Sequence, residues 1–366
     1  LREAVFKGLF EVNSEIVLFT VQSRLNKNRI IRLRFSGTNG SLIEEKVVGT
    51  SKSLSKNTSW YVMNCKGLDG YAILSCTDVP QFLECKIYVD HYNNSHEITK
   101  KVPLEIDRKK YDHLKVTSAE MLPEGICITL GLDKLKLNGT VSGIGNDPTD
   151  DIYDHHFMMY YIPNGSLIAK CKTINTSESL FPYYAKYSYN AFAKTLNVLM
   201  LSYLPVTYKF GIGQKYGAMM EQLFFKLDED DLSLNYNWVK NRLASDYLYG
   251  KADTTHYYAG LPVKMVTNQY GMTTVFSMAH TIAQPDDLGY RDYRFTYLGP
   301  IAITQFDDDG NELWGTVLPV IQGYYGVYPA YLLGRKQNYM TGVQQVIYER
   351  QFISFNSYCH NTNCYV

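Results

Sequence analysis

The feature that most constrains this chain is a repeated pair of hairpins. Each hairpin joins two runs rich in Val, Ile, Tyr, Phe and Thr through a short polar turn, which is typical of antiparallel β-strands. One repeat contains a tight hairpin, a variable loop and a second tight hairpin. The first hairpins lie at 6–21, 61–76, 114–130, 187–201, 263–278 and 343–356. The second hairpins lie at 29–48, 86–102, 158–171, 222–238 and 302–318.

A four-stranded antiparallel unit repeated five to six times predicts an all-β fold, a β-propeller of about six blades. Radial stacking would bury both apolar faces of each small twisted sheet. We predict a single propeller domain over residues 1–366, with an incomplete last blade. A pair of β-sandwiches is the alternative. The best helical candidate is short, from Tyr236 to Ala244. The predicted blades span roughly 1–50, 51–105, 106–175, 176–240, 255–320 and 335–366.

Composition excludes some classes of function. Lys and Arg total 36, as do Asp and Glu, so the net charge is zero and nucleic-acid binding is not expected. The longest apolar stretch, Leu196 to Leu201, is far too short to span a bilayer. The chain begins at Leu1 without a signal-peptide core, so we expect a processed or trimmed N-terminus, for which removal of an export signal is one explanation.

The hairpin Phe-Asp-Asp-Asp-Gly-Asn-Glu-Leu-Trp at residues 306–314 resembles the blade repeats of secreted and cell-envelope β-propeller proteins of Bacteroidota. Those repeats carry the phrase F-D-x-x-G-N-x-x-W. The resemblance implies an exported protein in the periplasm, at the outer membrane or on the cell surface, often within a surface or secretion assembly. It implies no catalytic residues. The same hairpin departs from the sialidase Asp-box, because Gly310 to Trp314 is one residue too long and its Ser and Thr are absent.

Few polar clusters suggest chemistry. The acidic turn 307–312 offers oxygens for calcium, but a hairpin turn with Gly310 at positive φ explains it equally well. His155 and His156 follow several aspartates and suggest either a divalent ion or a solvated loop. The glycine-rich segment 211–217 lacks the strand–helix context of a phosphate loop. No metal or cofactor is therefore expected.

The seven cysteines form no CxxC pair and no zinc-type cluster with His. Most are expected to be small buried side chains. A disulfide between adjacent strands within residues 65–85 is the alternative. Cys127 and Cys171 are expected to be buried and unpaired, because each lies in an apolar strand without a neighbouring cysteine in sequence.

Loop length and tyrosine content suggest a binding surface. The chain holds 32 Tyr, and many fall in long connections at 131–156, 203–220, 238–262, 280–300 and 319–342, all of which should emerge on one propeller face. Tyr offers rigid contact area with a hydroxyl for orientation, so this face could bind a protein or stack on a glycan, or the rings could pack the loops onto the blades. The candidate binding residues are Tyr247, Tyr249, Tyr257, Tyr258, Tyr290, Tyr293, Tyr324, Tyr325 and Tyr328.

The sequence supports two hypotheses of function. The first is a non-catalytic interaction propeller of an exported envelope or surface assembly, with a secretion or adhesion role and a protein or glycan partner. The alternative is a glycan-active hydrolase or lyase on the same scaffold, which would need two converging carboxylates. The acids nominated for that alternative are Asp253, Asp286, Asp287 and Asp292, and nothing in the sequence pairs them.

Overall fold

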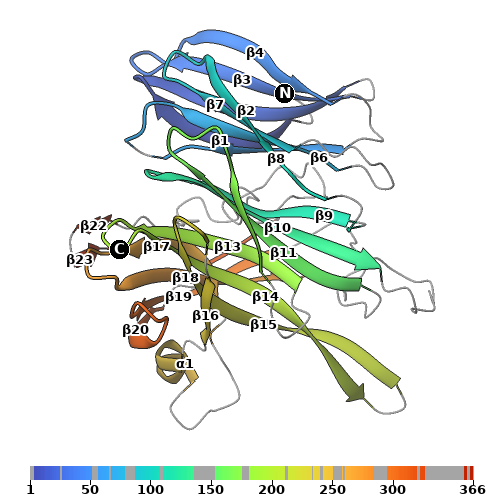
Figure 1. Cartoon of the computed structure of the whole chain (residues 1–366), viewed down its shortest axis with the longest axis vertical. Helices are drawn as coiled ribbons and strands as arrows, with labels where there is room; N and C mark the ends of the chain where they lie inside the picture. Colours follow the sequence, from blue (N-terminus) through green and yellow to red (C-terminus); the bar gives the residue numbers. More distant parts are fainter. Residues whose placement is uncertain are drawn as a thin grey trace. The chain divides into compact units, whose positions relative to one another are not determined.

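The computed structural model is an all-β chain with one short helix among the residues it describes (Figure 1). The described residues are 4–24, 27–51, 57–65, 67–78, 87–107, 110–111, 113–135, 153–174, 181–210, 213–232, 234–239, 242–249, 258, 260–283, 295–319, 322–325, 358–360 and 363–365. They fall into two compact units that divide at residues 181 and 182.

Unit 1 contains three four-stranded sheets. Sheet A comprises β1 (Ala4–Val12), β2 (Glu15–Arg24), β3 (Lys27–Ser36) and β4 (Leu42–Thr50). Sheet B comprises β5 (Asn57–Met63), β6 (Tyr71–Asp78), β7 (Ile87–Tyr92) and β8 (Ile98–Leu104). Sheet C comprises β9 (His113–Leu122), β10 (Gly125–Leu135), β11 (Tyr153–Pro163) and β12 (Lys170–Ile174).

Unit 2 contains two further sheets, a terminal hairpin and the helix. Sheet D comprises β13 (Phe181–Asn190), β14 (Thr195–Phe210), β15 (Gly213–Asp228) and β16 (Leu234–Val239). Sheet E comprises β17 (Leu261–Thr267), β18 (Thr273–Ala283), β19 (Phe295–Phe306) and β20 (Glu312–Leu318), and the short β21 (Gln322–Tyr325) pairs with the start of β19. The helix is α1 (Arg242–Tyr249), and β22 (Tyr358–His360) pairs with β23 (Asn363–Tyr365).

In all five large sheets, consecutive strands are neighbours and run antiparallel, which is the strand order of propeller blades. The predicted fold class, all-β with four-stranded antiparallel blades, is confirmed. The turns inside the hairpins are short, and none exceeds the seven residues 64–70. A single closed domain with a sixth blade at 335–366 stays a prediction. Among the described residues, no helix has the length and apolar content to cross a bilayer.

The core of unit 1 explains the continuous apolar runs in its sequence. On β6, Tyr71 and Ile73 pack in the cluster that sheet B shares with sheet A, whereas Ala72, Leu74 and Cys76 pack in the cluster shared with sheet C. Since both faces of this strand are buried, its sequence shows no polar alternation. The first strands of the three sheets lie together, because β5 contacts both β1 and β9.

In unit 2, sheets D and E share an apolar cluster that includes Leu199, Phe224 and Phe306. Helix α1 packs on β19 and β20, with Ala244 in a cluster with Ala302 and Val317. Close approach of the helix requires Gly315, since a Cβ there would lie 2.9 Å from the Leu243 Cβ. The Glu312 carboxylate accepts a 2.6 Å hydrogen bond from the Arg242 backbone N–H at the start of the helix.

Several local predictions were wrong. The helix lies at 242–249, whereas residues 236–239 belong to β16. The expected long loop at 203–220 is a continuation of one hairpin, in which β14 and β15 stay paired from Thr195 and Asp228 to Phe210 and Gly213. The alternating Tyr, Val and Phe of this segment suit an extended ladder, and only residues 211–212 connect the strands.

The cysteine predictions were half right. Cys127 is a free, fully buried thiol whose pKa is raised by burial and then by the charges of Glu120 and Glu124. Cys171 is free but exposed, because it lies on β12, an edge strand of sheet C. Cys65 and Cys76 carry thiols, and Cys85 lies outside the described residues.

Candidate functional site

The predicted tyrosines have different positions in the structure. Tyr247 lies on α1 with 64% of its surface exposed. Tyr249 is the last residue of α1, and Tyr324 and Tyr325 belong to β21 rather than to a loop. These two residues pair with Thr296 and Phe295 of β19. Four of the candidates and the four nominated acids lie outside the described residues, namely Tyr257, Tyr290, Tyr293, Tyr328, Asp253, Asp286, Asp287 and Asp292.

Tyr258 fits the alternative that candidate rings pack loops onto the blades. It is 3% exposed and lies in the cluster beneath α1. Its hydroxyl lies 2.8 Å from the Ser277 carbonyl and 2.7 Å from the Pro300 carbonyl, and its backbone N–H donates to the Ser245 hydroxyl at 2.7 Å. Tyr258 therefore links Ser245 of α1 to sheet E.

The acidic turn 307–312 is a hairpin turn, as one of its two interpretations predicted. The Asp307 carboxylate accepts hydrogen bonds from the backbone N–H groups of Asp309 and Asn311, and Gly310 has φ +84°. Burial alone would raise the pKa of Asp307, but the hydrogen bonds from Asn311, Asp309 and Gly310 lower it overall. Within the described part of the chain, no three His, Cys, Asp or Glu side chains converge to hold a metal ion.

The predicted histidine site is part of a strand. His155 and His156 belong to β11, where they pair with Asp133 and Leu132 of β10, and the His156 ring packs edge-on against Tyr111 at 5.8 Å. Of the glycine-rich segment 211–217, residues 213–217 lie inside β15, which gives no turn to cradle a phosphate.

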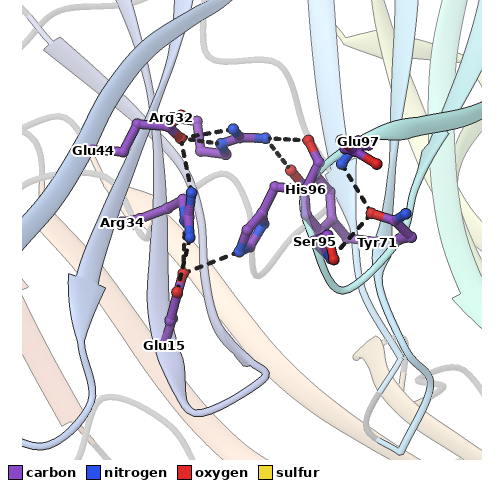
Figure 2. Close-up of polar contacts among 9 residues, drawn as sticks. Glu15, Arg32, Arg34, Glu44, Tyr71, Ser95, His96 and Glu97 are labelled. Atoms are coloured by element: carbon purple, nitrogen blue, oxygen red, sulfur yellow. Dashed lines mark hydrogen bonds and ion pairs between the residues drawn. The ribbon is translucent and has the colours of Figure 1, made fainter.

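A dense polar cluster lies in unit 1, where sheet A faces sheet B (Figure 2). Arg32 on β3 is 1% exposed, and its guanidinium donates to Glu44 on β4 at 2.7 and 3.2 Å. The same group donates to the Tyr71 hydroxyl at 2.8 Å and to the His96 carbonyl at 3.0 Å. One buried cation thus connects two strands of sheet A with β6 and the β7–β8 turn of sheet B.

A second ion pair extends this cluster. Arg34 donates to both carboxylate oxygens of Glu15, at 2.6 and 2.8 Å, and lies 3.5 Å from Glu44. Glu15 also contacts the His96 Nε2 at 3.1 Å. Because a carboxylate only accepts, the neutral imidazole donates through Nε2. Its buried Nδ1 has no hydrogen-bond partner among the described residues.

The electrostatics of this cluster stabilise fixed charges. The hydrogen bond from Arg34 is the main cause of the lowered pKa of Glu15. Burial would raise the pKa of Glu44, but the hydrogen bond and charge of Arg32 lower it overall. Burial and then the charges of Arg34 and Arg32 lower the pKa of His96, and burial raises that of Tyr71 to about 12. Each carboxylate is neutralised by an arginine, so neither is poised for proton transfer.

The polar cluster therefore joins sheets rather than performing a reaction. Sequence analysis did not identify this cluster, because Arg32 and Arg34 lie within the apolar strand pattern Arg-Ile-Ile-Arg-Leu-Arg-Phe. Their spacing of two was the available signal, since it places both side chains on the same face of β3. Their carboxylate partners come from two other strands, and no local pattern identifies these.

Unit 2 presents exposed apolar side chains where α1 meets β20. Leu243 and Tyr247 lie one helical turn apart on α1, and both are exposed. Leu313 of β20 is half exposed and lies two residues before Gly315, which approaches Leu243 closely. We call Leu243, Tyr247 and Leu313 the α1 surface. Ala244 of the same helix packs with Tyr258 in the buried cluster against sheet E.

Comparison with known proteins finds no matching family model and no matching curated sequence. Distant structural similarity exists to the α-L-arabinofuranosidase of glycoside hydrolase family 93 from Fusarium graminearum, at 10% identity, with 87% of this chain and 93% of that chain covered and a TM-score of 0.36. The apocarotenoid oxygenase of Synechocystis has 9% identity and a TM-score of 0.34. The match covers 88% of this chain, which spans about 64% of the length of that oxygenase. The WD40 domain of fission-yeast SCAP has 8% identity, with 86% and 76% covered and a TM-score of 0.26.

Proposed function

We propose that this chain is a binding module built from β-propeller blades, and that it recognises a protein or a glycan in an exported envelope or surface assembly. The observation that supports binding most directly is the α1 surface. Tyr247 is largely exposed on a helix that is itself held by a buried tyrosine, a capped N-terminus and a glycine contact. A rigid exposed aromatic ring loses little entropy on binding.

The location in an exported assembly rests on the resemblance of residues 306–314 to the Bacteroidota repeats. This segment includes Leu313 and Trp314 of β20, and Trp314 is half exposed. The motif and the α1 surface are therefore adjacent in the fold.

The test compares two tyrosines that are 11 residues apart in the sequence. Partners captured by the native full chain are identified first, and binding to the captured partner is then measured for Tyr247→Ala and Tyr258→Ala. Tyr247→Ala should weaken binding by about 2 kcal/mol with little change in the melting temperature. Tyr258→Ala should lower the unfolding free energy of unit 2 by about 3 kcal/mol, because it leaves a cavity and unpaired carbonyls.

Leu167→Ala is the control, since Leu167 is also exposed but lies in the β11–β12 turn of unit 1. Loss of binding in Tyr247→Ala but not in Leu167→Ala supports the α1 surface. Unchanged binding in Tyr247→Ala, with partner capture intact, would place the working surface elsewhere.

A further inference from the structure

The short hairpin turns of unit 2 form a surface that the function proposed above does not use. Four turns meet there, at 191–194, 229–232, 268–272 and 307–311. The first and third adjoin, since a Cβ on Gly271 would lie 3.4 Å from the Asn190 Nδ2. The same Cβ would lie 3.1 Å from Asp308 in the fourth turn. Glu229 connects the second turn to the first, because its backbone N–H donates to the Lys194 carbonyl at 3.0 Å.

Two aromatic rings project from the adjoining turns. Phe192 is 87% exposed and Tyr270 is 67% exposed. The backbone beneath each ring is held by an asparagine: Asn190 accepts hydrogen bonds from Phe192 and Ala193, and Asn268 accepts them from Tyr270 and Met272. The rings are therefore presented by ordered turns, which is the condition under which exposed aromatic side chains become binding anchors.

The charge around these rings has one dominant sign. The segments 190–194, 228–231, 268–271 and 307–311 contain seven carboxylates and one lysine. Some carboxylates stabilise the turns, as Asp228 does by accepting a 2.7 Å hydrogen bond from the Asp230 N–H. Lys226 pairs with Asp308, so one further positive charge is already neutralised. The hydrogen bonds that lower the pKa of Asp307 keep that carboxylate ionised at neutral pH.

We propose that this turn surface, centred on Phe192 and Tyr270, docks an arginine- or lysine-rich segment of a partner protein. Guanidinium and ammonium groups stack on exposed aromatic faces, and the surrounding carboxylates attract and orient them. An acidic segment or a nucleic acid would be repelled by the same carboxylates. A glycan would gain stacking on the rings but nothing from the charge. This surface is independent of the α1 surface, so either can fail alone.

The experiment uses the full-length chain and a fluorescein-labelled peptide of alternating Arg and Ser, with an alternating Glu and Ser peptide as the charge-reversed probe. Binding is followed by fluorescence anisotropy at low and at high salt. We expect the Arg peptide to bind, the Glu peptide not to bind, and binding to weaken with salt because the carboxylates are exposed. Phe192→Ala and Tyr270→Ala should each weaken binding roughly two- to fivefold.

Two variants separate docking on this surface from general attraction to an acidic protein. Asp309→Asn removes one exposed charge and should weaken binding at low salt only. Ile168→Ala removes an exposed apolar side chain from the β11–β12 turn of unit 1 and should change nothing. Melting temperatures should be unchanged in all four variants. Absence of peptide binding, or equal binding by the wild type and both aromatic variants, would overturn the proposal.

Discussion

The short-turn ends of the two units use charged side chains in opposite ways. In unit 1, Arg32, Arg34, Glu15 and Glu44 point inward, and the two arginines neutralise the two carboxylates between sheets A and B. In unit 2, the acids lie in the turns themselves, with exposed aromatic rings among them. The six turns of unit 1 hold three carboxylates, compared with six in the four turns of sheets D and E.

This difference shows that one blade architecture supports two uses of charge. Charges enclosed between sheets determine how the sheets pack and are unavailable to a ligand. Charges on the turns contribute little to packing, because water screens them, but they determine what can approach the surface. Substitutions of the same kind should therefore have very different effects in the two units.

The largest expected effect is that of Arg32→Ala in unit 1. Removal of the guanidinium leaves Glu44, Tyr71 and the His96 carbonyl without their shared donor inside the protein. We expect a loss of roughly 3–5 kcal/mol in the unfolding free energy of unit 1. Urea unfolding followed by Trp60 fluorescence measures it in a variant with Trp238→Phe and Trp314→Phe, since the chain has three tryptophans. A loss below about 1 kcal/mol would show that the cluster is not a structural link.

The second effect is the pH dependence that His91 gives to the stability of unit 1. Burial, with a contribution from the Lys100 charge, lowers the pKa of His91 to about 4 from its ordinary 6.5. Below pH 6.5 the unfolded chain binds a proton at His91 that the folded chain does not bind. The contribution of His91 to the unfolding free energy is therefore fully present above pH 6.5 and is lost as the pH decreases to about 4. The loss should reach roughly 3 kcal/mol. His91→Gln should remove most of the dependence of the unfolding free energy on pH in this range. An unchanged dependence would mean that other groups, including His96, cause it.

The third comparison uses two glycines with the same backbone conformation. Gly310 in unit 2 and Gly165 in unit 1 have φ of +84° and +80°. A Cβ on Gly310 would lie 2.8 Å from the Phe224 ring, whereas a Cβ on Gly165 meets nothing within 4 Å. Gly165→Ala should destabilise by about 1 kcal/mol from the backbone alone, and Gly310→Ala by about 2 kcal/mol or more. Thermal unfolding of both variants measures the difference. Equal losses of stability would mean that the Phe224 side chain moves aside at little energetic cost.

The smallest effect should come from Lys226→Ala in unit 2. This lysine pairs with Asp308, and both side chains are partly exposed. The expected loss is below about 1 kcal/mol, and it should shrink further at high salt. Urea unfolding at two salt concentrations, compared with Arg32→Ala, tests whether the two units differ as described. A loss of stability as large as that of Arg32→Ala would mean that the exposed ion pair of unit 2 and the buried ion pairs of unit 1 contribute equally.

The binding tyrosines show what sequence reasoning could not decide. Tyr247 and Tyr258 belong to the same aromatic segment and were predicted on equal grounds. Tyr247 is exposed on α1, whereas Tyr258 is buried against Ala302 and Val317 of sheet E. The composition of the segment is the same for both. Their burial differs because β19 and β20, which come later in the chain, cover one ring and leave the other exposed.

By itself, the sequence determined the strands, their pairing into hairpins and the positions of most tight turns. These depend on alternation within a few residues and on Gly, Asn and Asp at the turns, as at Asn190, Asn268 and Gly310. Tertiary structure alone decided that Arg32 is buried, that Cys171 is exposed and that β14 and β15 continue through an expected loop. The physical reason is that burial and ion pairing are set by neighbours from distant strands, and local periodicity carries no information about which strands these are.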